Sequence, residues 1–187
     1  MSVFGRLKNL FFSCTAQLTQ APEDRPLFRI IRELKVRRIV EIGVGHGERT
    51  LKMLDAAARN RGSSPVSYTG IDPFESRPDR ATGLSIKEAH RKLRKSKAHV
   101  QLVPGDALNA LMRVANSLSG TELLVISADQ QGASLDRAWF YVPRLLTPSS
   151  AILIEQIDPQ TGESTLQTLS RIEVEARATK ARPRRAA

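Results

Sequence analysis

The sequence predicts an α/β protein with a doubly wound, mostly parallel sheet of about five strands. Along residues 27–157, short apolar runs alternate with segments whose apolar residues have helical spacing. The first apolar run leads directly into a turn with three glycines, at Gly43, Gly45 and Gly47. An acidic residue stands at or just after the end of each of the next three runs, namely Asp72, Asp106 and Asp129. Alternation of this kind is typical of parallel sheets covered by helices.

The first half of the expected sheet comes from two strands and three helices. Residues 27–34 have helical apolar spacing and lead into the β-branched run at residues 38–42. A helix is expected from about 48 to 59, where Gly62 and Pro65 break the pattern. The second strand, residues 66–71, is followed by a polar loop and a basic helix from about 85 to 96.

The second half adds three strands and two helices. A strand at 100–103 precedes a helix that carries Leu108, Leu111, Met112 and Ala115. A strand at 122–126 precedes a helix with Leu135, Trp139 and Val142 on one face. The fifth strand is expected at 151–157, and the residues after it are polar.

The length of 187 residues and the 41% hydrophobic content suit a single core. Residues 1–26 are expected to form an amphipathic helix and a linker with two prolines, with the helix packed on the domain or acting as a surface anchor. Residues 27–158 form the expected domain, and residues 159–187 a polar, basic tail. No run reaches the roughly 18 apolar residues of a membrane span. A lone cysteine, Cys14, fits a reducing compartment, so a cytoplasmic location is expected.

The net charge of +10 is local. Residues 85–97 hold six bases and one acid, and residues 171–187 hold six bases and two acids, so the rest of the chain is nearly neutral. Neither segment interleaves aromatic residues or shows a nucleic-acid-binding motif. A solvated helix face and a solvated tail are therefore favoured over a nucleic-acid partner.

The expected strand ends suggest a site for a nucleoside with a charged group. In an open parallel sheet, ligands bind outside the carboxyl ends of the strands. The glycine turn presents backbone N–H groups and a helix N-terminus there, and the Asp72 carboxylate can accept hydrogen bonds from two sugar hydroxyls. Any one of these acids could instead be a turn or helix-cap residue.

The segment from Glu41 through Gly43, Gly45 and Gly47 resembles motif I of the class I S-adenosylmethionine-dependent methyltransferases. With Gly70-Ile71-Asp72-Pro73, it suggests their small-molecule O-methyltransferase-like branch, of the macrocin and cephalosporin-pathway type. The resemblance covers roughly residues 27–157 and implies a Rossmann-like fold and S-adenosyl-L-methionine as cofactor. It places the glycine turn around the methionine moiety, Asp72 at the ribose, Pro73 and Phe74 beside the adenine, and Asp106 at its amino group. The implied cofactor-binding residues are Glu41, Gly43, Val44, Gly45, Gly47, Asp72, Pro73, Phe74, Gly105, Asp106 and Ala107.

The sequence departs from this branch in two places. Where the branch commonly has Asp-x-Asp-His after the fourth strand, this chain has Ser127, Ala128, Asp129 and Gln130, so no metal site is expected. Asp129 and Glu155 remain as candidate catalytic residues, with Asp158 as a further candidate base. The chain after residue 157 also shows no antiparallel strand pair, so the C-terminus is expected to be shortened. The free edge of the fifth strand would then be covered by residues 165–176, by the N-terminal helix, or by a second subunit in a homodimer.

Methyl transfer to a small-molecule acceptor is the favoured function, because alignment of the donor with the acceptor can suffice without a metal. One alternative is a non-catalytic module that binds S-adenosylmethionine or a protein partner. A second alternative is an RNA-binding methyltransferase, suggested by the two basic segments.

Overall fold

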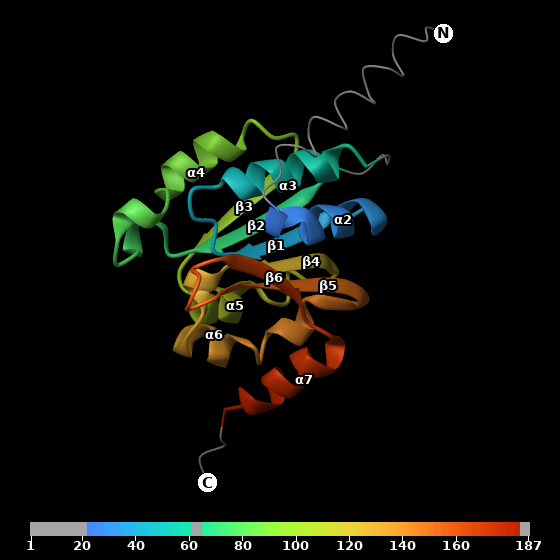
Figure 1. Cartoon of the computed structure of the whole chain (residues 1–187), viewed down its shortest axis with the longest axis vertical. Coiled ribbons are helices and arrows are strands. Elements are labelled where there is room, and N and C mark those ends of the chain that lie inside the picture. The colour runs from blue at the N-terminus through green and yellow to red at the C-terminus, as the bar shows by residue number, and fades with distance from the viewer. Residues whose placement is uncertain (1–21, 61–64, 184–187) are drawn as a thin grey trace, which may run out of the picture.

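The computed structural model describes residues 22–60 and 65–183 (Figure 1). The expected N-terminal helix and Cys14 lie outside the described residues. The linker predicted to run to residue 26 is shorter than expected, because a 3-10 turn (η1, Pro22–Asp24) leads directly into α2 (Arg25–Glu33), which carries Pro26 in its first turn. Proline is tolerated at this position because the first N–H groups of a helix have no intrahelical partner. No helix in the described part of the chain is long and apolar enough to cross a membrane.

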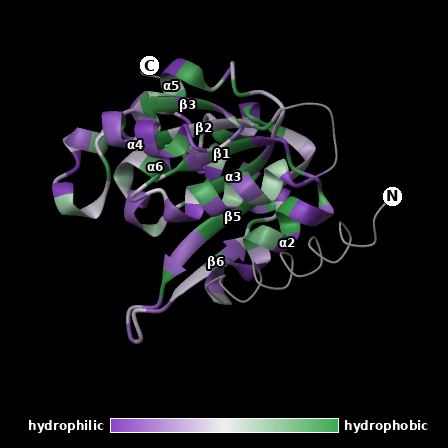
Figure 2. Cartoon of the chain, turned by 90° about the horizontal axis from the view of Figure 1, so that it is seen from above, coloured by the Kyte–Doolittle hydropathy of each residue, from purple (hydrophilic) through white to green (hydrophobic). Residues whose placement is uncertain are grey.

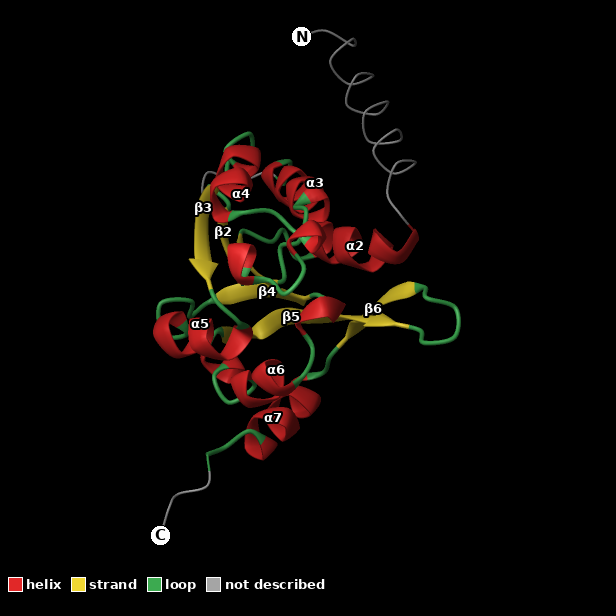
Figure 3. Cartoon of the chain, turned by 90° about the vertical axis from the view of Figure 1, so that its left-hand side faces the viewer, coloured by secondary structure: helices red, strands yellow, loops and turns green. Residues whose placement is uncertain are grey.

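The described strands form one six-stranded sheet in the order β3-β2-β1-β4-β5-β6. Every pairing is parallel except that of β5 with β6 (Figure 3). The strands are β1 (Arg38–Ile42), β2 (Ser67–Asp72), β3 (His99–Pro104), β4 (Thr121–Ile126), β5 (Leu146–Ile157) and β6 (Ser164–Thr168). This confirms the doubly wound, mostly parallel sheet, whose order reverses between β1 and β4 and so places a switch point at the glycine turn.

Helices cover both faces of the sheet, with α2, α3 and α4 on one face and α5, α6 and α7 on the other (Figures 1 and 3). Beyond α2, the helices are α3 (Glu48–Ala58), α4 (Ile86–Leu93), α5 (Ala107–Val114), α6 (Ala133–Ala138) and α7 (Arg171–Lys180). The helix expected around Trp139 is shorter than the apolar spacing predicted, because α6 ends at Ala138 and a 3-10 turn (η5, Val142–Arg144) follows.

The core consists of two apolar layers separated by the sheet. Side chains alternate along a strand, so Ile39 of β1 packs under α2 and α3, while Val40 and Ile42 pack over α5 and α6. Apolar residues concentrate on the strands and the inner helix faces, and polar residues on the outer faces (Figure 2). The layers are fixed by this alternation, which the sequence shows directly.

The C-terminal segment corrects two expectations. The chain was expected to end its sheet at five strands and to continue as a solvated tail from residue 159. Instead, β6 pairs antiparallel with β5, and α7 follows with a capping box at Ser170 and with Val174 fully buried. The β6 strand has only five residues, most of them polar, so alternation of apolar and polar side chains does not predict a strand there. The β5 edge is therefore paired by the chain's own β6, residues 164–168, which agrees with the first of the three coverings expected for it, and the edge no longer supports the homodimer expectation.

Candidate functional site

The glycine turn between β1 and α3 lies at the carboxyl edge of the sheet, next to the end of β4. Gly43, Gly45 and Gly47 all have positive φ, at 96°, 55° and 73°. A Cβ on Gly43 would lie 2.7 Å from Cγ of Gln130 and 2.7 Å from Cβ of Ser127. The turn therefore needs glycine at this position for backbone conformation and for space.

Asp72 ends β2 and binds the glycine turn through its carboxylate. Its Oδ2 accepts hydrogen bonds from the N–H of Val44 at 2.7 Å and of Gly45 at 3.1 Å. Its Oδ1 accepts from the N–H of Phe74 at 2.7 Å and from Nε of Arg77 at 2.9 Å. With 1% of its surface exposed, Asp72 ties the turn after β1 to the loop after β2.

Arg77 bridges two of the strand-end acids that the sequence singled out. Its Nη2 also donates to Asp72, and its Nη1 donates to Oδ2 of Asp129 at 2.5 Å. Burial lowers the pKa of Arg77, but its hydrogen bonds to the two carboxylates outweigh burial and raise it overall. The Arg77 guanidinium is therefore charged, and it pairs with Asp72, the carboxylate predicted to bind a ribose.

A cavity of about 400 Å³ opens beside this bridge, between the ends of β2, β3 and β4. Pro73, Asp106, Ala107 and Ser134 are among the residues that line it. Asp106 is the N-cap of α5: its side chain accepts from the N–H of Asn109 at 3.1 Å and from the hydroxyl of Ser134. Burial raises its pKa, but these hydrogen bonds hold the pKa below the ordinary value overall. An ionised acceptor thus faces the cavity.

We call the glycine turn, Asp72 and the cavity together the cofactor cradle. Two other predicted cofactor residues support the backbone of this cradle. Phe74 is 2% exposed, has a φ of 49°, and packs with Val44 and Ala89. Gly105 has a φ of 129° and donates its N–H to the carbonyl of Asp72 at 3.0 Å. Both residues hold the backbone at the end of β2 in place.

Glu41 points into the layer between β1 and α3 and is 1% exposed. Its Oε2 accepts from the hydroxyls of Thr50 at 2.7 Å and Tyr68 at 2.6 Å, and Nε of Arg49 lies 3.8 Å from Oε1. Burial raises the pKa of Glu41 further than Arg49 and the hydroxyls lower it. A Cβ on Gly70 would lie 2.7 Å from the Tyr68 hydroxyl, so this glycine leaves the space for it.

Arg49 joins three strand ends under the site. Its Nη2 donates to the Ser127 hydroxyl at 2.6 Å, and its Nη1 donates to Oε1 of Glu155 at 2.9 Å. Glu155 also accepts from the Ser164 hydroxyl at 2.7 Å and the Ala128 N–H at 3.1 Å. Burial raises the pKa of Glu155, but the hydrogen bond and charge of Arg49 and these two donors together hold it below its usual value.

The two candidate catalytic acids therefore differ. The side chain of Asp129 is 44% exposed and accepts from Nη1 of Arg77 and from Nε2 of Gln130, whereas that of Glu155 is 17% exposed and already accepts from several donors. Asp158 lies outside the site, in the turn between β5 and β6. Within residues 22–60 and 65–183, no group of three His, Cys, Asp or Glu side chains is arranged to hold a metal.

The cradle offers S-adenosylmethionine an open cavity and the Asp106 carboxylate, while the N–H groups of Gly43, Val44, Gly45 and Gly47 are already bonded within the protein. Within the glycine turn there is open space at Gly45, which is half-buried, since a Cβ there would meet only the Thr82 carbonyl oxygen, at 3.9 Å. The Asp106 carboxylate lines the cavity, whereas Asp72 is buried behind Arg77, which does line it. Arg77 is the obstacle, because it occupies the acceptor atoms of Asp72.

Arg77 and Arg49 connect the predicted acids, but no sequence pattern indicates either of them. Arg77 lies in the loop after β2 and reaches Asp129, 52 residues away; Arg49 reaches Glu155, 106 residues away. No spacing rule links residues so far apart. The only available signal was that several acids gather at one edge, where buried carboxylates require cationic partners.

Comparisons with known proteins show the family and the fold of the chain. A family profile described as a methyltransferase domain matches residues 40–157. No curated protein matches the sequence. Among solved structures, the O-methyltransferase TomG from Streptomyces achromogenes, which is involved in tomaymycin synthesis and was solved with S-adenosylmethionine, is 15% identical with a TM-score of 0.53. The cofactor-bound protein Rv0187 from MTB is 18% identical with a TM-score of 0.54.

Both structures match 87% of this chain, but the match covers only 67% of TomG and 66% of Rv0187. A precorrin-6y C5,15-methyltransferase from Geobacter metallireducens GS-15 is covered over 61% of its length. The chain thus spans about two thirds or less of these solved structures. At these identities the likeness shows the class I methyltransferase fold, and the family match extends over more than half of the sequence. The chain belongs to the methyltransferase-domain family.

Proposed function

We propose that the protein transfers a methyl group from S-adenosylmethionine to a small-molecule acceptor without a metal. The observation that carries the proposal is the cradle at the carboxyl edge, where Asp72 holds the glycine turn and bonds Arg77, which lines an open cavity together with Asp106. The macrocin and cephalosporin-pathway branch remains a prediction from the sequence.

The residues of the cradle have distinct proposed roles. Gly43, Val44, Gly45 and Gly47 present backbone to the methionine moiety, and Glu41 stabilises that turn from the buried side through α3 and β2. Asp72 accepts from the ribose hydroxyls. On the adenine side, Pro73, Ala107 and Asp106 line the cavity, while Phe74 and Gly105 support the backbone beneath. When bound, S-adenosylmethionine supplies an electrophilic methyl group.

Ribose binding at Asp72 requires Arg77 to leave that carboxylate. Arg77 already donates to Asp129, so it can stay paired with that carboxylate when it leaves Asp72. The Asp72 carboxylate would then accept from the ribose hydroxyls in place of Arg77. The acceptor would then be aligned at the ends of β4 and β5. Positioning of this kind supplies much of the barrier reduction in a reaction of two bound partners.

Asp129 is the better candidate for removing a proton from the acceptor. Each of the two carboxylates pairs with an arginine, but the Asp129 side chain is 44% exposed against 17% for Glu155, so an acceptor can reach Asp129. The ion pair with Arg49 makes Glu155 a poor metal ligand, and Ser127 provides no carboxylate. Metal-independent transfer is therefore the mechanism we propose.

The proposal predicts methyl transfer that is unaffected by chelators. We expect transfer of a radiolabelled methyl group to at least one member of a panel of phenols and hydroxylated small molecules, at equal rates with and without EDTA. The Asp129→Asn variant should slow transfer by about 10²-fold or more if Asp129 is the base. Chelator-sensitive activity restored by magnesium would contradict the mechanism. Cofactor binding without transfer to any panel member would favour the non-catalytic alternative.

A further inference from the structure

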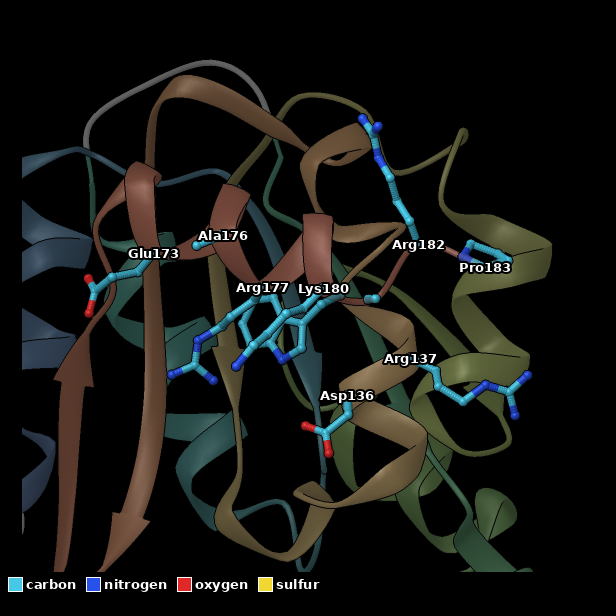
Figure 4. Close-up of a pocket in the computed structure, with 10 residues that line it drawn as sticks. Asp136, Arg137, Glu173, Ala176, Arg177, Lys180, Arg182 and Pro183 are labelled. Carbon is cyan, nitrogen blue, oxygen red and sulfur yellow. The ribbon is translucent and has the colours of Figure 1, made fainter. Parts of the chain in front are cut away.

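A second cavity lies between α6 and α7, on the sheet face opposite α2 and α3 (Figure 4). It has a volume of about 980 Å³, and α6 separates it from the proposed cofactor cradle. Ser134 of α6 lines the cradle, whereas Asp136 and Arg137 of the same helix line the second cavity. We call this second cavity the α6–α7 groove. Its charged side chains are Arg137, Arg177, Lys180, Arg182, Asp136 and Glu173.

One lining residue of the groove, Trp139, carries a buried donor without an acceptor. Trp139 is 2% exposed, and in the described part of the chain its indole Nε1–H is the buried side-chain polar group that lacks a hydrogen-bond partner. Such a group costs free energy in the folded state unless an acceptor reaches it. Trp139 lines the groove, so an acceptor could approach it from that side.

Two cations of α7 line the groove together with Trp139. The guanidinium carbon of Arg177 lies 5.1 Å from the centroid of the Trp139 ring, and Lys180 follows one helical turn later on α7. Figure 4 shows both side chains extending over the same part of the groove, with Asp136 on the facing helix and with Arg137 and Arg182 pointing away. Among residues 22–60 and 65–183, neither Arg177 nor Lys180 forms an ion pair.

We propose that the α6–α7 groove is a second ligand site, which binds the oxyanion group of a small organic molecule through Arg177, Lys180 and the Trp139 N–H. A carboxylate or a phosphate has the charge for both cations and the lone pairs for the indole donor. Arg177 covers the indole ring, so it would have to swing toward the anion to open the path to the N–H. A small ligand is favoured over a nucleic acid, because the donor is buried and each wall of the groove carries an acid, Asp136 on α6 and Glu173 on α7.

The protein carries its own reporter for this site, because Trp139 is its single tryptophan. Its fluorescence would be followed while inorganic phosphate or acetate is added to the full chain, with chloride keeping the ionic strength constant. We expect a saturable change with at least one of the two oxyanions, and the tighter one identifies the preferred class. No S-adenosylmethionine is present, so the outcome is independent of the proposed methyl transfer.

Matched variants make the test specific. Arg177→Gln and Lys180→Gln should each weaken oxyanion binding by about tenfold. Arg171→Gln removes the same charge from α7, but at an exposed residue that pairs with Glu175 outside the groove, and should bind as the wild type does. Trp139→Phe, titrated by calorimetry, should lose binding because it lacks the N–H. An equal response to chloride, equal binding by the Arg177 and Arg171 variants, or a response to an RNA oligonucleotide but to neither oxyanion would overturn the proposal.

Discussion

Replacing Glu41 by alanine is expected to lower the free energy of unfolding by about 3–5 kcal/mol. The change removes the acceptor of two buried hydroxyls, those of Thr50 and Tyr68, and leaves a cavity beside them. Buried hydroxyls without an acceptor keep the full cost of their lost hydration. Arg49 retains Glu155 as a partner, so the loss is expected to come from the hydroxyls and the cavity rather than from Arg49.

Urea unfolding of the wild type, Glu41→Ala and Glu41→Gln would measure this effect, with the exposed Glu163→Ala as control. The glutamine variant keeps an acceptor oxygen and should lose less than the alanine variant. A loss for Glu41→Ala no larger than that for Glu163→Ala would show that the network under the turn contributes little.

The pH dependence of stability should also distinguish the wild type from the Glu41→Gln variant. Burial raises the pKa of Glu41 above its ordinary value of 4.5, so the folded state holds this proton more tightly than the unfolded state does. The wild type should therefore lose stability relative to Glu41→Gln as the pH rises from 4.5 through the raised pKa. A difference between the two proteins that does not change with pH would contradict this direction.

The second large effect is expected at Asp72. Asp72→Asn removes the charge that faces Arg77 and one of the oxygens that hold the glycine turn, so affinity for S-adenosylhomocysteine should fall by roughly 1–3 kcal/mol. Arg77→Met is the informative partner variant, because it frees the carboxylate for the ribose and should bind the ligand at least as tightly as the wild type. If Arg77 competes with the cofactor, calorimetric titration should find weaker S-adenosylhomocysteine binding for Asp72→Asn and equal or tighter binding for Arg77→Met. Equal weakening by both would show that Arg77 itself holds the ligand.

The local parts of the fold could be predicted from the sequence. The β1 strand, the glycine turn and α3 follow from apolar spacing and from three glycines within five residues, and the structure has them at nearly the expected bounds. The β6 strand could not be predicted, because Ser164–Thr168 is short and its pairing depends on β5 rather than on its own composition.

Of the residues that form the candidate site, the acids could be predicted from the sequence, but their partners could not. Strand ends at one edge bring Asp72, Asp106 and Asp129 together, as the topology requires. Their partners could not be predicted, because Arg77 and Arg49 connect segments that are far apart in the sequence. The sequence also could not show that Glu41 faces the buried layer: strand alternation fixes which side it occupies only once the sheet and α3 are in place.

The most direct test of the cofactor assignment is a calorimetric titration of the full chain with S-adenosylhomocysteine, and separately with NAD. The cradle predicts saturable binding of S-adenosylhomocysteine at one site, with a dissociation constant on the order of micromolar, or about −8 kcal/mol, and no comparable binding of NAD. Absence of S-adenosylhomocysteine binding by a folded protein, or tighter binding of NAD, would contradict the assignment.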